Sequence, residues 1–150
     1  MELTVAKRQI EIKFDFKTMF KINNKLGSIS ENGQRNTDGV GTIFYNILER
    51  NEQALIDLVK ISNSSGKKAL TDDEILDAIA EQVEAEGSVE PLFAEIEEEM
   101  VASGFFKEKI LKYIDNMSKT LGYLEVKEDV DETQIKVIKD MIGRMTNAVS

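Results

Sequence analysis

The 150-residue sequence contains no cysteine, no histidine, no tryptophan and a single proline. Without cysteine, disulfide bonds, thiol nucleophiles and thiolate metal sites are excluded. Without histidine, Ser-His-Asp and Cys-His catalytic arrangements are excluded, and the common zinc sites lose their usual ligands. Any catalysis would depend on carboxylates, lysines, tyrosines and hydroxyls. The composition therefore favours a binding protein over an enzyme.

The sequence also has no long hydrophobic run, and no stretch approaches the ~18 consecutive apolar residues of a membrane-spanning helix. The first residues, MELTVAKRQIEIKF, lack the basic and then apolar pattern of a signal peptide. We therefore expect a cytoplasmic protein with no membrane partner. The length and the 41% content of hydrophobic residues suit one folded domain, or one domain with an appendage.

The charge of the chain is negative overall and unevenly distributed. The formal net charge is −9, which predicts repulsion from nucleic acid phosphates. From Asp72 to Glu99 the sequence has twelve acidic residues and no basic one, and the remaining 16 acidic and 19 basic residues leave the rest of the chain at +3. The first 35 residues are basic. This asymmetry predicts either directional contact with a partner or a solvated acidic helix face.

No sequence motif predicts a cofactor or metal site. Gly39-Val40-Gly41 stands at the expected start of a helix, but a dinucleotide-binding fingerprint needs a preceding strand and a third glycine, and Phe44 occupies that position. The GxxxxGK[ST] phosphate-binding loop is absent. Residues 129–140 lack the glycine and the final glutamate of a calcium-binding loop. We therefore predict no enzymatic activity and no cofactor.

The N-terminal residues alternate between apolar and polar side chains, as in a half-buried β-hairpin. The apolar positions are Leu3, Val5, Ile10, Ile12, Phe14 and Phe16. A lone hairpin is marginally stable in water, so we expect helices on its apolar face. The period changes after residue 16, where Phe16, Met19, Phe20 and Leu26 fall roughly on one helical face.

Amphipathic helical patterns continue to the C-terminus, interrupted by a linker at residues 62–68. Residues 40–61 read as two helices or one bent helix, and Thr71 to Glu74 form a capping box before the first acidic helix. The fold class predicted is α+β, mostly α-helical, with a short N-terminal β-hairpin packed on a bundle of about five to six helices. We predict a hairpin-plus-helices core at residues 1–121 and a C-terminal helical segment at residues 122–150.

The last helix has an apolar seam with heptad spacing, and the acidic helix near residue 96 has an apolar face with several large side chains. These two faces supply the predicted partner-binding residues, which are Leu92, Phe93, Ile96, Met100, Ile135, Ile138, Ile142 and Met145. Methionine adapts to varied apolar partners, although the same spacing also suits a protein core.

Four segments follow one another in a recognisable order. They are MELTVAKRQIEIKFDF with KTMFKINNKLG, GTIFYNILERNEQALIDLVKIS, TDDEILDAIAEQ and SVEPLFAEIEEEMVASGFF. Their order, spacing and residue classes resemble the siphophage tail assembly chaperones. That family opens with a hairpin of the type L-x-I-x-G-x-x-Y-x-L-x-F and a helix, continues with an ALxDLLxxA helix, and then has T-x-E-E-I-x-x-x-L and L-x-x-L-x-x-E-V-x-x-A-L-x-x-S segments. The resemblance covers residues 1–106.

The resemblance implies a non-enzymatic phage morphogenesis factor that binds the tape measure protein, a long, helical, aggregation-prone chain. Such chaperones keep that protein soluble in the cytoplasm of the bacterial host while tail tube subunits polymerise around it, and they are absent from the mature virion. A longer isoform made by frameshifting recruits the tail tube protein in many families, and this chain would correspond to the short form.

Two other interpretations of the charge pattern stay open. The basic N-terminal region is complementary to the acidic segment of a neighbouring copy, which would give self-association. An acidic inhibitor that mimics nucleic acid, or another acidic adaptor protein, is the alternative function. A nucleic acid mimic needs carboxylates spaced like phosphates over one exposed face, whereas a chaperone needs an exposed apolar surface for its client.

Overall fold

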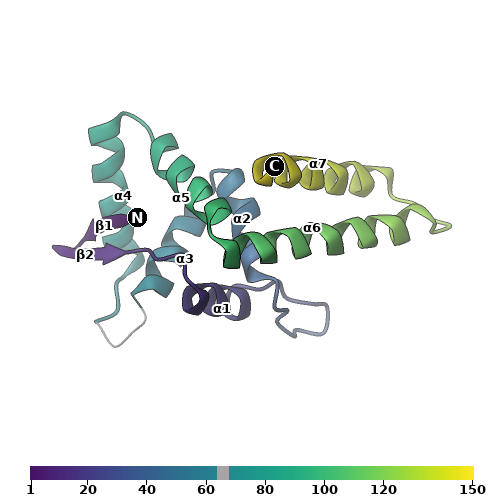
Figure 1. Cartoon of the computed structure of the whole chain (residues 1–150), viewed down its shortest axis with the longest axis horizontal. Helices are drawn as coiled ribbons and strands as arrows, with labels where there is room; N and C mark the ends of the chain where they lie inside the picture. The colour runs from purple at the N-terminus through teal and green to yellow at the C-terminus, as the bar shows by residue number, and fades with distance from the viewer. Residues whose placement is uncertain (64–67) are drawn as a thin grey trace.

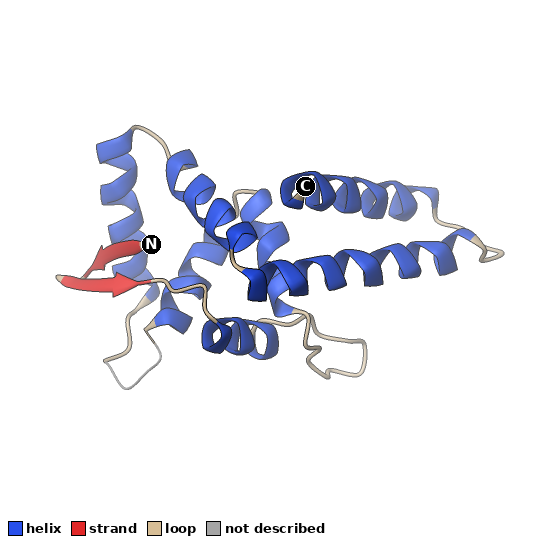
Figure 2. Ribbon diagram, viewed as in Figure 1, coloured by secondary structure: helices blue, strands red, loops and turns tan. Residues whose placement is uncertain are grey.

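The computed structural model describes residues 1–63 and 68–150 of the chain. The described residues form a two-stranded hairpin and seven helices: β1 (Glu2–Val5), β2 (Arg8–Glu11), α1 (Phe16–Lys25), α2 (Gly39–Leu48), α3 (Glu52–Ser62), α4 (Asp72–Glu86), α5 (Glu90–Ala102), α6 (Gly104–Glu125) and α7 (Glu132–Val149). The hairpin and α4 lie at one end of the molecule, and α6 and α7 extend to the other end (Figures 1 and 2). The predicted mostly helical α+β fold with an N-terminal hairpin is confirmed.

The hairpin is antiparallel and pairs Leu3 with Ile10 and Val5 with Arg8. Its two turn residues, Ala6 and Lys7, have positive φ angles of 49° and 64°, so the turn has the left-handed backbone of a tight hairpin without the glycine that usually supplies it. The side chains of Leu3, Val5, Ile10 and Ile12 are all buried, and β1 contacts α4. Helix packing on one face thus stabilises a hairpin that would be marginal alone.

Helix α2 lies at the centre of the fold and contacts α1, α3, α5, α6 and α7. Its sequence, GVGTIFYNIL, is nearly all apolar, as a helix surrounded by other elements requires. Gly39 lies against the backbone of Ile22 in α1. Gly41 lies against the ring of Tyr113 in α6. The two glycines therefore permit close packing of helices, which is a structural role.

The prediction of five to six helices was wrong, because the chain breaks between α2 and α3. Arg50 has a left-handed backbone with φ of 55°, a conformation that does not continue an α-helix. The Asn51 side chain then accepts a hydrogen bond from the backbone N–H of Gln53 and caps α3. The capping box predicted from Thr71 and Glu74 is present at the start of α4.

The side chain of Arg50 ties this break to α5. Its guanidinium donates hydrogen bonds to Glu90 at 2.6 and 2.9 Å and to Glu97 at 2.9 Å, and it lies 5.7 Å from the centre of the Phe93 ring. The two bonds to Glu90 form a bidentate pair, which has stricter geometry than a single ion contact. The α2–α3 turn is thereby held against the acidic segment of the sequence.

Stability is expected to fall in acid, because several carboxylates are hydrogen bonded in the folded chain. The hydrogen bond from Arg50 lowers the pKa of Glu90, and the hydrogen bond from Tyr45 lowers the pKa of Glu49, in each case below the ordinary value of 4.5. A group whose pKa is lower in the folded state than in the unfolded state stabilises the fold at pH values above its unfolded-state pKa. That stabilisation is lost as the pH falls through its folded-state pKa. The melting temperature should thus stay level above pH 4.5 and fall below it.

A melting series in buffers of constant ionic strength measures this dependence, with Glu90→Gln as the comparison. The substitution should flatten the acid limb of the curve, because one of the titrating groups is removed. A melting temperature that rises as the solution is acidified would contradict the prediction and would mean that relief of repulsion among the acidic residues dominates.

Helices α6 and α7 are antiparallel, and residues 115–150 of this pair are called the arm here. The connection between the two helices lies far from the body, and the C-terminal end of α7 returns to it (Figure 1). Arg144 ties α7 to the body by donating hydrogen bonds to the Glu49 carboxylate at 2.7 Å and to the Leu48 carbonyl at 3.2 Å. Met145 and Val149 are buried in the same core as the rest of the chain.

The predicted boundary between residues 121 and 122 falls within α6, and the division into a core and a C-terminal segment stays a prediction. The predicted linker at residues 62–68 begins with the last residue of α3, and its residues 64–67 lie outside the described part.

Candidate partner-binding surface

The predicted partner-binding residues of α5 lie in the core of the chain. The buried residues of this predicted set are Leu92, Phe93, Ile96 and Met100 of α5, together with Met145 of α7. Helix α5 packs on α2 and α6, so its apolar face is already covered by the chain's own helices. Partner binding by these five side chains stays a prediction, and it would require α5 or α7 to move.

The other three predicted residues are on the arm. Ile135, Ile138 and Ile142 are half-buried on α7, at the seam where α7 packs on α6. Only part of each side chain is accessible to a partner, because α6 covers one side of this seam. Among the three, Ile138 also lines a pocket with residues of α6, described below.

The exposed apolar surface includes an aromatic patch that we define by Phe16, Phe20 and Phe105. Their side chains are 57%, 58% and 49% exposed. Phe16 and Phe20 are one turn apart on α1, and the Phe16 and Phe105 rings meet edge to face with centres 5.6 Å apart. Exposed aromatic side chains gathered from two helices are typical of a protein-binding surface.

A groove lies along α6, on the side of the helix that also carries Phe105, and it leads toward the arm. Its wider part, about 410 Å³, lies between α6, α1 and the loop before α2, and its narrower part, about 240 Å³, reaches α7. The lining residues, which define the α6 groove, are Asn23, Asn36, Thr37, Asp38, Lys109, Lys112, Tyr113, Asn116, Met117, Thr120 and Ile138. Because Asp38, Tyr113 and Asn116 line both parts, the groove is continuous.

The chemistry of the α6 groove changes along its length. Lys109 and Lys112 give the wider part positive charge, and neither makes an ion pair with any residue in 1–63 or 68–150. The Asp38 carboxylate accepts hydrogen bonds from the N–H and the hydroxyl of Ser28, both at 2.7 Å, and these uncharged donors do not cancel its negative charge. Burial raises the pKa of the Tyr113 hydroxyl, which keeps this residue neutral. The narrower part is mostly apolar.

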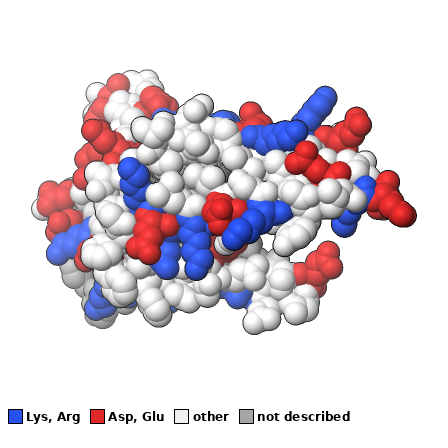
Figure 3. Space-filling model, turned by 45° about the vertical axis from the view of Figure 1, so that its right-hand side comes forward, with Lys and Arg blue, Asp and Glu red and all other residues white. Residues whose placement is uncertain are grey.

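Acidic side chains gather at the end of the molecule opposite the tip of the arm, where α4 lies, and others lie at the centre of this face and on the arm (Figures 1 and 3). Some of them are neutralised within the chain: Asp72 pairs with Lys60, Glu90 and Glu97 pair with Arg50, and Glu99 pairs with the N-terminal amine at 3.4 Å. The remaining carboxylates, such as Asp77 and Glu84, are exposed. The acidic segment is thus a folded and partly ion-paired surface.

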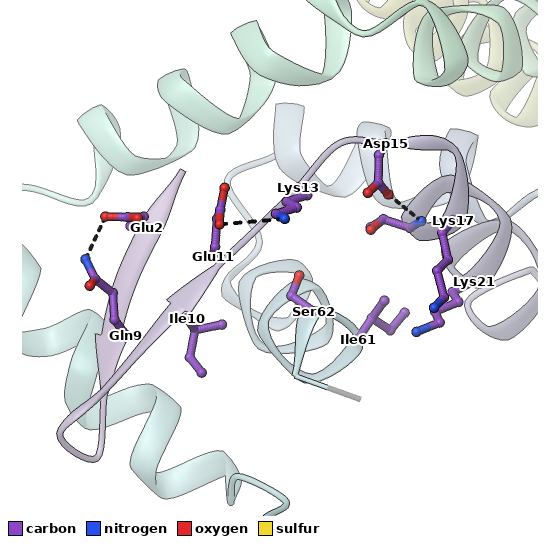
Figure 4. A pocket seen from close by; sticks show the side chains of 11 residues that line it. Glu2, Gln9, Ile10, Glu11, Lys13, Asp15, Lys17, Lys21, Ile61 and Ser62 are labelled. Carbon is purple, nitrogen blue, oxygen red and sulfur yellow. Dashed lines mark hydrogen bonds and ion pairs between the residues drawn. The ribbon is translucent and has the colours of Figure 1, made fainter. Parts of the chain in front are cut away.

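A second hollow, about 500 Å³, lies between β2, α1 and the end of α3 (Figure 4). Its charges offset one another: Lys13 lies 4.0 Å from Glu11, Gln9 donates to Glu2 at 2.6 Å, and Asp15 accepts the backbone N–H of Thr18 at 2.9 Å. This last hydrogen bond lowers the pKa of Asp15, as expected for an N-cap carboxylate. The side chains in this hollow stabilise local structure and do not converge on one point.

The part of the chain that the structure describes has no group of three acidic residues placed to hold a metal ion. No helix within the described ranges is long and apolar enough to cross a membrane. The prominent features of the described surface are therefore the aromatic patch, the α6 groove and the acidic end.

Sequence reasoning missed both the aromatic patch and the groove. Phe16 and Phe20 share an apolar stripe with Met19, and nothing in the spacing tells which edge of the stripe faces the core. Lys109 and Lys112 lie three residues apart on an amphipathic helix, which is a common pattern on solvated faces. The positions of Lys109 and Lys112 could have indicated the groove, because these residues lie one and two turns beyond Phe105 on the same side of α6.

These surfaces define a class of protein: a small helical protein that offers exposed apolar and basic faces to other proteins. The family is shown by the sequence, because residues 2–114 match the family model described as phage tail assembly chaperone protein, TAC. The chain therefore belongs to the phage tail assembly chaperone family, as the resemblance predicted. The match covers the hairpin, α1 to α5 and the first half of α6, and it ends where the arm begins. Comparisons with curated proteins and with solved structures gave no match.

Proposed function

We propose that this chain binds the tape measure protein of its phage and keeps it soluble until the tail tube has assembled around it. Membership of the tail assembly chaperone family supports a protein partner in tail assembly. The observation that carries the proposal is the aromatic patch, because Phe16, Phe20 and Phe105 are exposed in a chain whose core is otherwise closed. A helical, aggregation-prone client would bury its apolar face on such a surface.

The proposal extends to where and how long the chain acts. A chaperone of this kind works in the cytoplasm of the bacterial host and leaves before the virion is complete. The tail tube protein is proposed as a further partner, recruited through a longer isoform of which this chain represents the short form. The chaperone role is non-enzymatic. The acidic end favours solubility of the coated client, because exposed carboxylates on neighbouring complexes repel one another.

The nucleic acid mimic is the less favoured function. Its carboxylates would have to be free, but four of the twelve acidic residues from Asp72 to Glu99 are engaged in ion pairs within the chain, namely Asp72, Glu90, Glu97 and Glu99. Family membership also points to a chaperone. The proposed role therefore rests on the apolar surface and treats the acidic surface as a means of solubility.

Co-expression with the tape measure protein encoded by the same genome tests the proposal. We expect the tape measure protein to shift from the insoluble to the soluble fraction and to co-elute with this chain in size-exclusion chromatography. The combined substitution Phe16→Ser and Phe20→Ser should abolish the shift, because it removes the exposed rings that α1 contributes.

A matched control removes two exposed apolar side chains from other faces. Leu111→Ser with Val137→Ser replaces two side chains of comparable fractional exposure, 48% and 53%, on other faces of α6 and α7. The control should preserve co-elution. If the tape measure protein stays insoluble with the wild-type chain and no complex elutes, the proposed function is wrong.

A further inference from the structure

The α6 groove joins three surfaces of different chemistry in a fixed order. Phe105, whose exposed ring meets that of Phe16, precedes Lys109 and Lys112 on the same side of α6. The two lysines line the larger part of the groove, and an apolar pocket beside Ile138 of α7 follows. Along α6 this stripe extends from residue 105 to residue 120, which at 1.5 Å per residue is about 22 Å, or four helical turns. That is the length of a typical docked segment of a partner chain.

The middle of the groove carries positive charge that the chain does not neutralise. Lys109 and Lys112 line the wider part together with the amide side chains of Asn23, Asn36 and Asn116. No ion pair with either lysine is present within residues 1–63 and 68–150. The two lysines lie three residues apart on α6, about one turn of the helix, so their charges act on the same part of the groove.

The groove has few local groups that could serve as partners for these lysines. The Asp38 carboxylate in the groove accepts hydrogen bonds from two uncharged donors of Ser28, so with Lys109 and Lys112 the lining carries a net charge of +1. The Asp115 carboxylate pairs with Lys119 at 3.1 Å. The amide groups of Asn23, Asn36 and Asn116 offer both hydrogen-bond donors and acceptors. The middle of the groove is therefore complementary to carboxylates from outside the chain, and its two ends are complementary to apolar side chains.

We infer that the α6 groove binds a segment of the client in which carboxylates are flanked on both sides by aromatic or aliphatic side chains. One flanking side chain packs on the Phe16 and Phe105 rings. The carboxylates lie over Lys109 and Lys112. The other flanking side chain enters the pocket beside Ile138 and Met117. This inference rests on the proposed function, because it names the chemistry of the client segment that the chaperone holds.

The inference assigns a function to the base of the arm, which lies beyond residue 114, where the family match ends. Ile138 is the α7 residue in the groove, so α7 must pack on α6 for the apolar pocket to exist. The arm therefore supplies one wall of the binding site. Of the three predicted partner-binding residues of the seam, Ile138 is the one that lines the groove.

Labelled synthetic peptides that overlap along the tape measure protein test the inference by fluorescence anisotropy with the full chain. We expect binding to be confined to peptides with the apolar, acidic, apolar order, and to weaken as salt is added. Lys109→Glu with Lys112→Glu should weaken that binding roughly tenfold or more. The control Lys127→Glu with Lys136→Glu, which changes the charge equally on exposed parts of the arm, should bind like the wild type.

A charge-swapped peptide excludes a mere folding defect of the variant. When lysines replace the acidic residues of the bound peptide, its affinity for the wild type should fall and its affinity for the Lys109→Glu with Lys112→Glu chain should rise. Equal binding of the original peptide by wild type and variant would overturn the inference. So would a variant whose only defect is loss of self-association in sedimentation, because the groove would then be occupied by a second copy.

The outcomes separate this inference from the proposed function. If the full-length tape measure protein co-elutes with the wild type but no acidic–apolar peptide binds in the groove, the inference is wrong and the proposed function stands. If the full-length tape measure protein does not bind the wild type, the proposed function is wrong, and the inference that rests on it is wrong as well.

Discussion

Gly39→Ala is expected to destabilise the fold by about 3 kcal/mol or more, although alanine is ordinarily the better helix residue. A Cβ atom built at Gly39 would lie 1.9 Å from the carbonyl oxygen of Ile22 and 2.8 Å from its carbonyl carbon. Both are backbone atoms of α1, so no side-chain rotation can relieve the contact. Helix α1 would have to move away from α2, which would expose the Met19 and Ile22 side chains that α1 buries. Urea denaturation followed by circular dichroism measures the free energy of unfolding.

Gly122→Ala and Gly143→Ala are the matched controls. Both glycines are inside helices, α6 and α7, and a Cβ atom at either meets nothing within 4 Å. We expect these two variants to be as stable as the wild type or more stable by up to about 1 kcal/mol, because alanine favours the helix. If Gly39→Ala unfolds at the same urea concentration as these controls, the close packing of α1 on α2 is not what the structure indicates.

The two glycines of α2 also show what the sequence could not tell. As a sequence, Gly39-Val40-Gly41 looks like a fragment of a cofactor-binding motif, and only the lack of a strand and of a third glycine argues against it. The packing partners of the two glycines, Ile22 and Tyr113, are 17 and 72 residues away along the chain. No local rule connects positions so far apart, because close approach of helices depends on the tertiary arrangement.

Features governed by neighbouring residues were predicted well. The hairpin follows from a period of two in its side chains, and the start of α4 follows from a capping box that needs only Thr71 and Glu74. The break between α2 and α3 was left open because Arg50 adopts a left-handed backbone that glycine or asparagine would ordinarily signal. Its hydrogen bonds to Glu90 and Glu97, far along the chain, help to hold that conformation.

The exposed surface of the candidate site depends on the tertiary arrangement for a related reason. An apolar stripe on a helix is wider than the strip that a neighbouring helix covers, so the sequence identifies the stripe but not its buried edge. In α1, Met19 and Ile22 are buried in the core, whereas Phe16 and Phe20 are exposed. In α5, Phe93 and the other large side chains of the apolar face are buried. Five of the eight predicted partner-binding residues therefore lie on covered faces, and their role in binding stays a prediction.

Phe93→Ala is expected to lower the free energy of unfolding by about 3–5 kcal/mol and to leave the binding surface intact in the molecules that remain folded. The Phe93 side chain is 0% exposed, and the guanidinium of Arg50 lies over its ring. Removing the ring leaves a cavity in the core. Because the free energy of unfolding of a protein is typically about 5–15 kcal/mol, a large share of molecules should stay folded at low temperature. Binding of the tape measure protein, measured at that temperature, should fall only in proportion to the unfolded fraction.

Phe16→Ala should show the opposite pattern. Its ring is 57% exposed and contacts Phe105, so its removal should cost about 1 kcal/mol or less in stability while weakening capture of the tape measure protein. Comparing the two variants in the same denaturation and co-elution measurements separates a core residue from a surface residue. A Phe93→Ala chain that keeps wild-type stability but loses its partner would contradict this assignment. It would mean that α5 swings away to offer Leu92, Phe93, Ile96 and Met100 to the client, as the sequence pattern alone predicts.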